Sequence, residues 1–234
     1  MNEKGRILRR GHGFQLDHIG LAVPDTAKGV AFVEEKTGAT PHLGPPQPGN
    51  FYWSGALSIG KESYLEIIGP NPDHRGVHPF KSVMAGLSEP TLMFWYVATD
   101  DFEAFAKKVE NASARLQQIV RVDAQDDQGA DYTRAIIGPG FLSQRPSVIE
   151  WRRRSIRSPV DIRCTLKSFS LSLRRPKELN SLFAKLGVDT PVHDGPSGMS
   201  ITVDTPKGEI EFTNAGYNLT PMKMLAAVLK RPLG

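Results

Sequence analysis

The chain has 234 residues, a hydrophobic content of 39% and a formal net charge of +4, which suits one or two globular domains with a sizeable core. It contains no run of about 18 apolar residues, so no membrane-spanning helix is expected. The single cysteine, Cys164, excludes an internal disulfide and any zinc site built from several cysteines.

The N-terminal segment, residues 1–14, is charged and lacks the apolar stretch of a signal peptide. We therefore expect a flexible leader on a cytoplasmic protein. Arginines cluster at residues 6–10 and 152–157. A nucleic-acid-binding face would need such clusters in one patch with stacking aromatic residues. Since one cluster lies in the expected leader and the other in a linker, we predict no nucleic-acid partner.

The first unit opens with a strand at residues 16–23, where apolar residues alternate with small or polar ones. His18 then lies on the face opposite the apolar one. Asp25 can cap a following helix that Gly38 ends. Three further strands are expected at residues 40–43, 51–58 and 63–68.

The order of one strand, one helix and three strands returns in a second unit and begins again in a third. The second unit is expected to have a strand at 92–99, a helix from Asp100 or Asp101 to about 111, and strands at 117–122, 132–137 and 147–152. The third is expected to have a strand at 163–173, a helix at 176–186, a hairpin at 199–213 and a last helix at 221–229. This repeat predicts an α+β fold built from βαβββ modules.

We expect three parts after the leader. Modules 15–70 and 92–152 pair with each other, and residues 71–91 connect them as a loop that contains His74 and His78. Residues 160–234 form a third, incomplete module with a C-terminal helix. Because a lone module has an open sheet edge, we expect it to pack on the first two modules or on a second chain in a homodimer.

Two glutamates occupy the same place in the first two units. Glu66 and Glu150 each stand between apolar residues near the middle of the fourth strand. Alternation would put both on the face that carries His18. A carboxylate in such a place is costly unless it is hydrated, paired or bound to a metal. The pattern therefore predicts a site that His18, Glu66 and Glu150 share.

Three stretches carry a resemblance to a known family. They are LDHIGLAVPD at residues 16–25, SYLEIIGP at 63–70, and the aromatic strand 92–99 with the two aspartates that follow it. Over residues 15–214 the chain resembles the vicinal oxygen chelate superfamily in its glyoxalase-like branch. The resemblance implies that the repeated βαβββ modules form a curved mixed sheet around a cleft. It also implies a divalent metal (Zn, Mn or Fe) held there by His18, Glu66 and Glu150. The fourth ligand position of the family falls on Phe94, which cannot bind a cation.

Two functions stay open. The first is an enzyme, a lyase, isomerase or dioxygenase of the vicinal oxygen chelate type, that acts on a small oxygenated metabolite. In it Glu66 and Glu150 would be catalytic, either through the metal or, without one, with a glutamate as base. The second is a metal-free protein that binds or sequesters a small molecule.

For both functions we predict the same substrate-binding residues. Tyr64, Phe94 and Tyr96 would form walls of the cleft. Arg152 alternates onto the face of Glu150, where it would pair either with a substrate carboxylate or with Glu150 itself.

Overall fold

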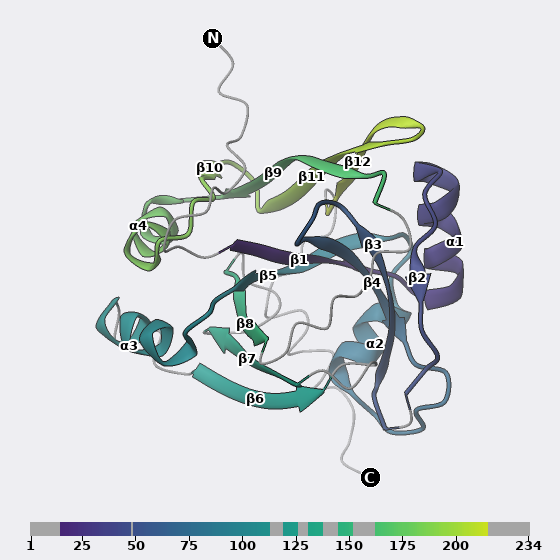
Figure 1. The fold of residues 1–234 in the computed structure, drawn as a ribbon, viewed down its shortest axis with the longest axis horizontal. Coiled ribbons are helices and arrows are strands. Elements are labelled where there is room, and N and C mark those ends of the chain that lie inside the picture. Colours follow the sequence, from purple (N-terminus) through teal and green to yellow (C-terminus); the bar gives the residue numbers. More distant parts are fainter. Residues whose placement is uncertain are drawn as a thin grey trace.

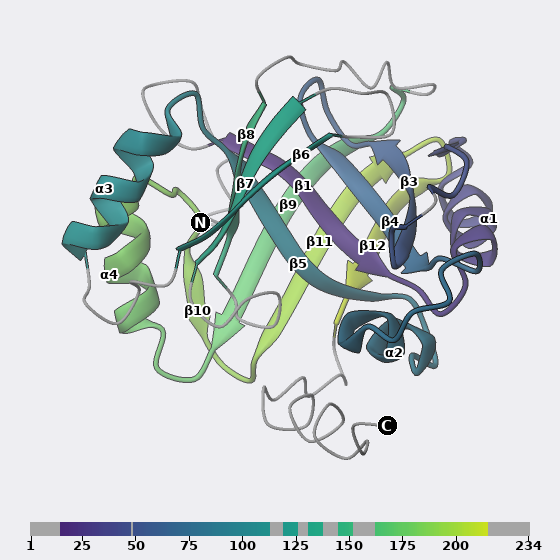
Figure 2. The same cartoon turned by 90° about the horizontal axis from the view of Figure 1, so that it is seen from below.

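The computed structural model describes residues 15–47, 49–112, 119–125, 131–137, 145–151 and 162–214. Within these residues an eight-stranded sheet has the order β2-β3-β4-β1-β5-β8-β7-β6, and a four-stranded sheet has the order β10-β9-β11-β12. The small sheet lies over the large one, with α3 and α4 side by side at one end of the molecule and α1 at the other (Figures 1 and 2). In this part of the chain no helix is long and apolar enough to cross a membrane.

The large sheet consists of two βαβββ modules, as predicted. The first has β1 (Gln15–Ala22), α1 (Thr26–Thr37), β2 (His42–Leu43), β3 (Tyr52–Ser58) and β4 (Tyr64–Pro70). The second has β5 (Thr91–Ala98), α3 (Phe102–Ala112), β6 (Ile119–Gln125), β7 (Asp131–Ile137) and β8 (Ser147–Trp151). In each module the first strand pairs in parallel with the fourth, and β1 pairs antiparallel with β5. The two modules therefore join through their first strands into one mixed sheet.

Local sequence explains where the helices begin and end. The side chain of Asp25 accepts a hydrogen bond from the Lys28 N–H at 3.1 Å, and Gly38 ends α1 with a φ of 69°. Asp101, the second of the two predicted candidates, accepts from the Ala104 N–H at 2.9 Å and caps α3. The segment between the modules holds the short helix α2 (Pro79–Ala85), which contacts β4.

The third unit has the predicted strand, helix and hairpin, adds the short strand β10 before the hairpin, and pairs its strands differently from the first two units. It comprises β9 (Thr165–Leu173), α4 (Lys177–Leu186), β10 (Val192–Asp194), β11 (Gly198–Thr205) and β12 (Gly208–Thr213). Its first strand, β9, lies between β10 and β11, whereas β1 and β5 each pair with the fourth strand of their own module. The leader at 1–14 and the helix expected at 221–229 lie outside the described residues.

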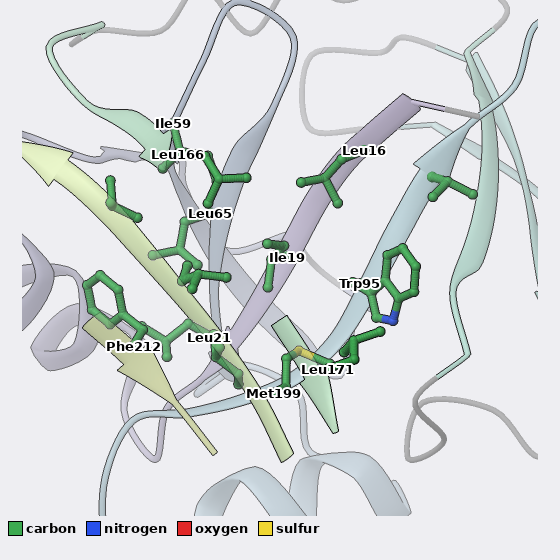
Figure 3. Close-up of a cluster of buried hydrophobic side chains, with 14 of the residues drawn as sticks. Leu16, Ile19, Leu21, Ile59, Leu65, Trp95, Leu166, Leu171, Met199 and Phe212 are labelled. Atoms are coloured by element: carbon green, nitrogen blue, oxygen red, sulfur yellow. The ribbon is translucent and has the colours of Figure 1, made fainter. Parts of the chain in front are cut away.

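One apolar core, which we call the shared core, joins the two sheets. Strands β1, β4 and β5 contribute Ile19, Leu65 and Trp95, and the third unit contributes Leu171 and Met199 (Figure 3). The indole of Trp95 is fully buried between the two sheets. The third unit is thus covered by the modules of its own chain, which was one of the two expected arrangements. The homodimer and the cytoplasmic location remain predictions.

Candidate functional site

The face of the large sheet opposite the shared core carries most of the predicted site residues, and we call it the site face. Pairing in the sheet brings them together from three strands. His18 on β1 stands directly between Tyr64 on β4 and Tyr96 on β5, and Gly20 stands between Glu66 and Phe94. The structure thus places Tyr64, Glu66, Phe94 and Tyr96 around His18.

The imidazole of His18 is held between two aromatic rings. Its centroid lies 4.8 Å from that of Tyr64 and 4.2 Å from that of Tyr96, with interplanar angles of 19° in both cases. The ring of Phe94 meets it edge-on at 6.2 Å. His18 is only 5% exposed. Because both faces of the imidazole are covered, a partner can reach His18 only through its ring nitrogens, in the plane of the ring.

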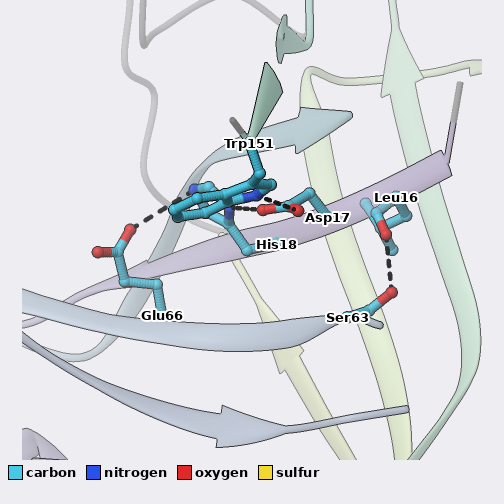
Figure 4. A network of polar contacts seen from close by, with 6 residues as sticks. All are labelled: Leu16, Asp17, His18, Ser63, Glu66 and Trp151. Atoms are coloured by element: carbon cyan, nitrogen blue, oxygen red, sulfur yellow. Dashed lines mark hydrogen bonds and ion pairs between the residues drawn. The ribbon is translucent and has the colours of Figure 1, made fainter. Parts of the chain in front are cut away.

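Both ring nitrogens of His18 face carboxylates (Figure 4). Nδ1 lies 2.6 Å from Oδ1 of Asp17, and Nε2 lies 3.7 Å from Oε2 of Glu66. The other oxygen of Asp17, Oδ2, accepts a hydrogen bond from the indole N–H of Trp151 at 2.9 Å. Since an ionised carboxylate only accepts hydrogen bonds, the contact with Asp17 places a proton on Nδ1 of His18, and Nε2 is the nitrogen directed toward Glu66.

An irregularity in β1 explains why neighbours in the sequence can touch in this way. The register with β5 shifts between Leu16 and His18, so that two residues of β1 correspond to one of β5. Leu16 and Ile19 both belong to the shared core, whereas the two residues between them, Asp17 and His18, do not. A bulge of this kind breaks the alternation of faces and places the carboxylate beside the ring.

Glu150 does not join this group, and its predicted place on the site face is wrong. Its Oε1 accepts a hydrogen bond from the N–H of Phe102, the first residue of α3, at 3.2 Å. Its neighbours Ile149 and Trp151 pack with Phe94 and Tyr96 in the apolar cluster of the site face, while Val148 is in the shared core. In the observed register Ile149 pairs with Ala98 and Val148 with Val97 of the shared core, so Glu150 points away from the site face.

The residues present do not fit the three-ligand metal centre predicted from the resemblance. Glu150 is directed to the start of α3, and the ring of Phe94 lies over Gly20 at the fourth family position. Across the described ranges, no three His, Cys, Asp or Glu side chains come close enough together to hold a metal ion. What the site face does assemble is an acid–base group of Asp17, His18 and Glu66.

Apolar and aromatic side chains surround this group. The buried members of the cluster are Ala22, Ile68, Phe80, Met84, Leu87, Met93, Phe94, Tyr96, Tyr132 and Ile149. Phe80 and Met84 come from α2, so the connection between the modules also covers the site face. Arg152, the remaining predicted substrate-binding residue, lies outside the described residues.

Asp17 and Trp151 belong to the site but were not predicted from the sequence. One signal could have pointed to Asp17, because it stands between Leu16 and His18 and gives two consecutive polar residues in a strand that otherwise alternates. Two such residues predict either a bulge or a buried charge. No local signal marks Trp151, since its partner is 134 positions away in the sequence.

The paired modules and the histidine and glutamate on strands one and four define a protein of the vicinal oxygen chelate superfamily. A model of the glyoxalase-like domain matches residues 16–187, and the chain belongs to that family. No curated protein matches it.

Solved structures resemble this chain at low sequence identity. A hypothetical protein from Staphylococcus aureus is 13% identical with a TM-score of 0.56, over 86% of this chain and 84% of that one. Methylmalonyl-CoA epimerase from Streptomyces coelicolor, solved with 2-nitronate-propionyl-CoA, is 18% identical with a TM-score of 0.45, over 61% of this chain and 100% of that one. Methylmalonyl-CoA epimerase from Mycobacterium tuberculosis is 15% identical with a TM-score of 0.42, over 62% and 91%.

Proposed function

We propose that the protein is an enzyme that moves a proton on a small oxygenated metabolite at the site face. The observation that supports this proposal is the placement of His18 between the carboxylates of Asp17 and Glu66, buried among aromatic rings. General acid–base catalysis needs two groups that can exchange a proton in an environment that water does not dominate. His18 and Glu66 are such a pair, and Asp17 holds one of them in place.

The three side chains would have different roles. Glu66, with 13% of its side chain exposed, is the most accessible of them and would meet the substrate. Its carboxylate would take the proton from a carbon next to a carbonyl group, and the electron pair would move onto the carbonyl oxygen. Nε2 of His18 would accept that proton from Glu66, and Asp17 would stabilise the resulting imidazolium. Return of the proton to the carbon completes the exchange.

Solvent exchange tests this function without knowledge of the natural substrate. The protein is incubated in D₂O with a panel of small 2-oxo and 2-hydroxy acids and their esters, and NMR follows the loss of the C–H signal next to the carbonyl. We expect at least one compound to exchange, with a rate about 100-fold lower or more in Glu66→Gln and in His18→Asn. Glu150→Gln is the matched control, since its carboxylate contacts α3, and it should exchange at the wild-type rate.

Two results would contradict the proposal. One is exchange that is equally fast in wild type and Glu66→Gln. The other is elemental analysis, on protein purified without chelator, that finds about one equivalent of metal in wild type and none in Glu66→Gln. That second result would show that His18 and Glu66 are metal ligands, as the family resemblance implied.

The second candidate is the metal-free binding protein. The observation that favours it is the apolar surround of the acid–base group, to which Phe80, Phe94 and Tyr96 contribute rings. Such a surface suits an aromatic or aliphatic ligand. A compound that raises the melting temperature of wild type but exchanges no proton, and that binds Glu66→Gln equally well, would support binding alone.

A further inference from the structure

Trp151 connects the second module to the acid–base group of the first. It lies at the end of β8, and its indole N–H reaches Oδ2 of Asp17 on β1 at 2.9 Å. We propose that Trp151 is a positioning residue that fixes the proton of His18 on Nδ1 by holding Asp17. The importance of this role for turnover rests on the function proposed above, whereas the position of the proton does not.

The environment of Asp17 makes its two partners necessary. The residue is 6% exposed, so its carboxylate cannot rely on water for hydrogen bonds. Oδ1 faces His18 and Oδ2 faces Trp151, so that each oxygen has one donor. With both oxygens engaged, the carboxylate plane cannot turn. Loss of the indole donor would leave Oδ2 without this bond and allow the group to rotate away from His18.

The surroundings of His18 turn that rotation into a change of tautomer. The rings of Tyr64 and Tyr96 keep the imidazole in one plane, so its two nitrogens stay directed to Asp17 and Glu66. Within that plane, the bond to Asp17 is the interaction that favours the proton on Nδ1. When this bond weakens, the carboxylate of Glu66, whose Oε2 lies 3.7 Å from Nε2, favours the tautomer with the proton on Nε2. Nε2 then has no lone pair with which to accept a proton.

The chain offers a substitution that removes the donor and little else. The indole ring system of Trp151 also packs against Tyr132, with ring centroids 5.1 Å apart. Trp151→Phe keeps an aromatic ring there and lacks only the N–H. Trp53 is the matched control. It lies on β3, away from His18, and its indole N–H donates to the carbonyl oxygen of Gly44 at 2.6 Å. Trp53→Phe removes a comparable hydrogen bond without touching Asp17.

The test reads the tautomer directly. Long-range ¹H–¹⁵N NMR on protein with labelled histidine distinguishes the two neutral forms of His18, and His18→Asn assigns the signal. We expect the Nδ1–H form in wild type and in Trp53→Phe, and a substantial share of the Nε2–H form in Trp151→Phe. Asp17→Asn is the reference for a fully shifted tautomer, since its side-chain amide can donate to Nδ1 and should give the Nε2–H form. Melting curves confirm that each variant is folded.

Activity provides the second measurement. With a compound found by solvent exchange, Trp151→Phe should lower kcat about 10- to 100-fold, the effect usual for residues that orient a functional group, and leave KM unchanged. A folded Trp151→Phe with the wild-type tautomer would overturn the positioning role, whatever happens to the rate. A shifted tautomer in a protein that exchanges no compound would support that role and contradict the proposed function instead.

Discussion

At the scale of single residues, two bulges, one in β1 and one in the neighbouring strand β5, shape the site. Asp17 is the extra residue of β1, and Met93 is the extra residue of β5, where the register shifts again between Gly20 and Leu21. Met93 and Phe94 both belong to the site-face cluster, while Leu92 is in the shared core. Each bulge thus adds one side chain to the site face that strict alternation would have sent to the other side.

Glycine is needed at position 20, which pairs with Phe94 beside the second bulge. A Cβ added there would lie 2.2 Å from Cζ of Phe94, which is itself buried. Gly20→Ala should therefore destabilise the protein by about 1–3 kcal/mol, because the ring has to leave its place. Urea unfolding measures the change.

Gly60→Ala is the control, since nothing lies within 4 Å of a Cβ at that turn. In a double-mutant cycle, Phe94→Leu should remove part of the cost of Gly20→Ala. Fully additive effects would show that the close approach of ring and backbone is not the cause.

At the scale of elements, α2 depends on a histidine. His78 caps this helix, and its Nδ1 accepts a hydrogen bond from the Phe80 N–H at 3.2 Å. Its ring stacks on Phe51 at 3.5 Å. Only an unprotonated Nδ1 can accept this bond. His74 and His78 lie outside regular helix, as predicted, but His78 begins the helix that covers the site face.

This cap predicts a pH-dependent stability. Burial, and second the nearby His74, lower the pKa of His78 below its usual 6.5. The folded protein therefore binds this proton less readily than the unfolded chain. The stability that His78 contributes is complete above pH 6.5 and is lost as the pH falls below that value.

Urea unfolding at pH 7.5 and pH 5.5 checks the prediction. The stability of wild type should fall more between these two values than that of His78→Asn, because asparagine caps a helix without titrating. Lys81 donates to the carbonyl of His74, and this contact remains in both proteins. An equal fall in the two proteins would assign the acid sensitivity to other groups.

At the scale of the whole molecule, the shared core makes the two sheets depend on each other. Trp95 of the large sheet meets the rings of Phe169 and Phe183 of the third unit, at 5.0 and 5.7 Å. Leu171 in the small sheet and Ile19 in the large one are both fully buried. Neither sheet can separate without exposing this apolar surface to water.

We therefore expect the protein to unfold in one step, with a large effect of a single core residue of the third unit. Leu171→Ala should lower the free energy of unfolding by about 2–5 kcal/mol, through lost burial and the cavity that remains. Far-UV circular dichroism and tryptophan fluorescence should report the same midpoint in urea, since the tryptophans lie in the large sheet.

Val77→Ala serves as the control, because Val77 is 79% exposed and its truncation should change stability by less than about 0.5 kcal/mol. If Leu171→Ala separates the two signals into two transitions, the third unit folds on its own and the core is not cooperative.

The amino-acid sequence by itself determined the modules and their ends. Alternation of apolar residues located β1 and β9, Asp25 and Gly38 located the ends of α1, and the repeat of strand, helix and three strands predicted the fold class. These features depend on hydrogen bonds and burial within about ten neighbouring residues, so they can be recognised without knowledge of the fold.

Only the tertiary structure decided which side chains meet on the site face. Pairing with β5 creates the bulge at Asp17, and the register of β8 turns Glu150 to α3 and Trp151 to Asp17. A shift of one residue reverses the face of every side chain in a strand, and its energy comes from the partner strand rather than from the local sequence. For that reason the sequence put His18 and Glu66 on one face, where the structure also has them, but pointed to neither Asp17 nor Trp151.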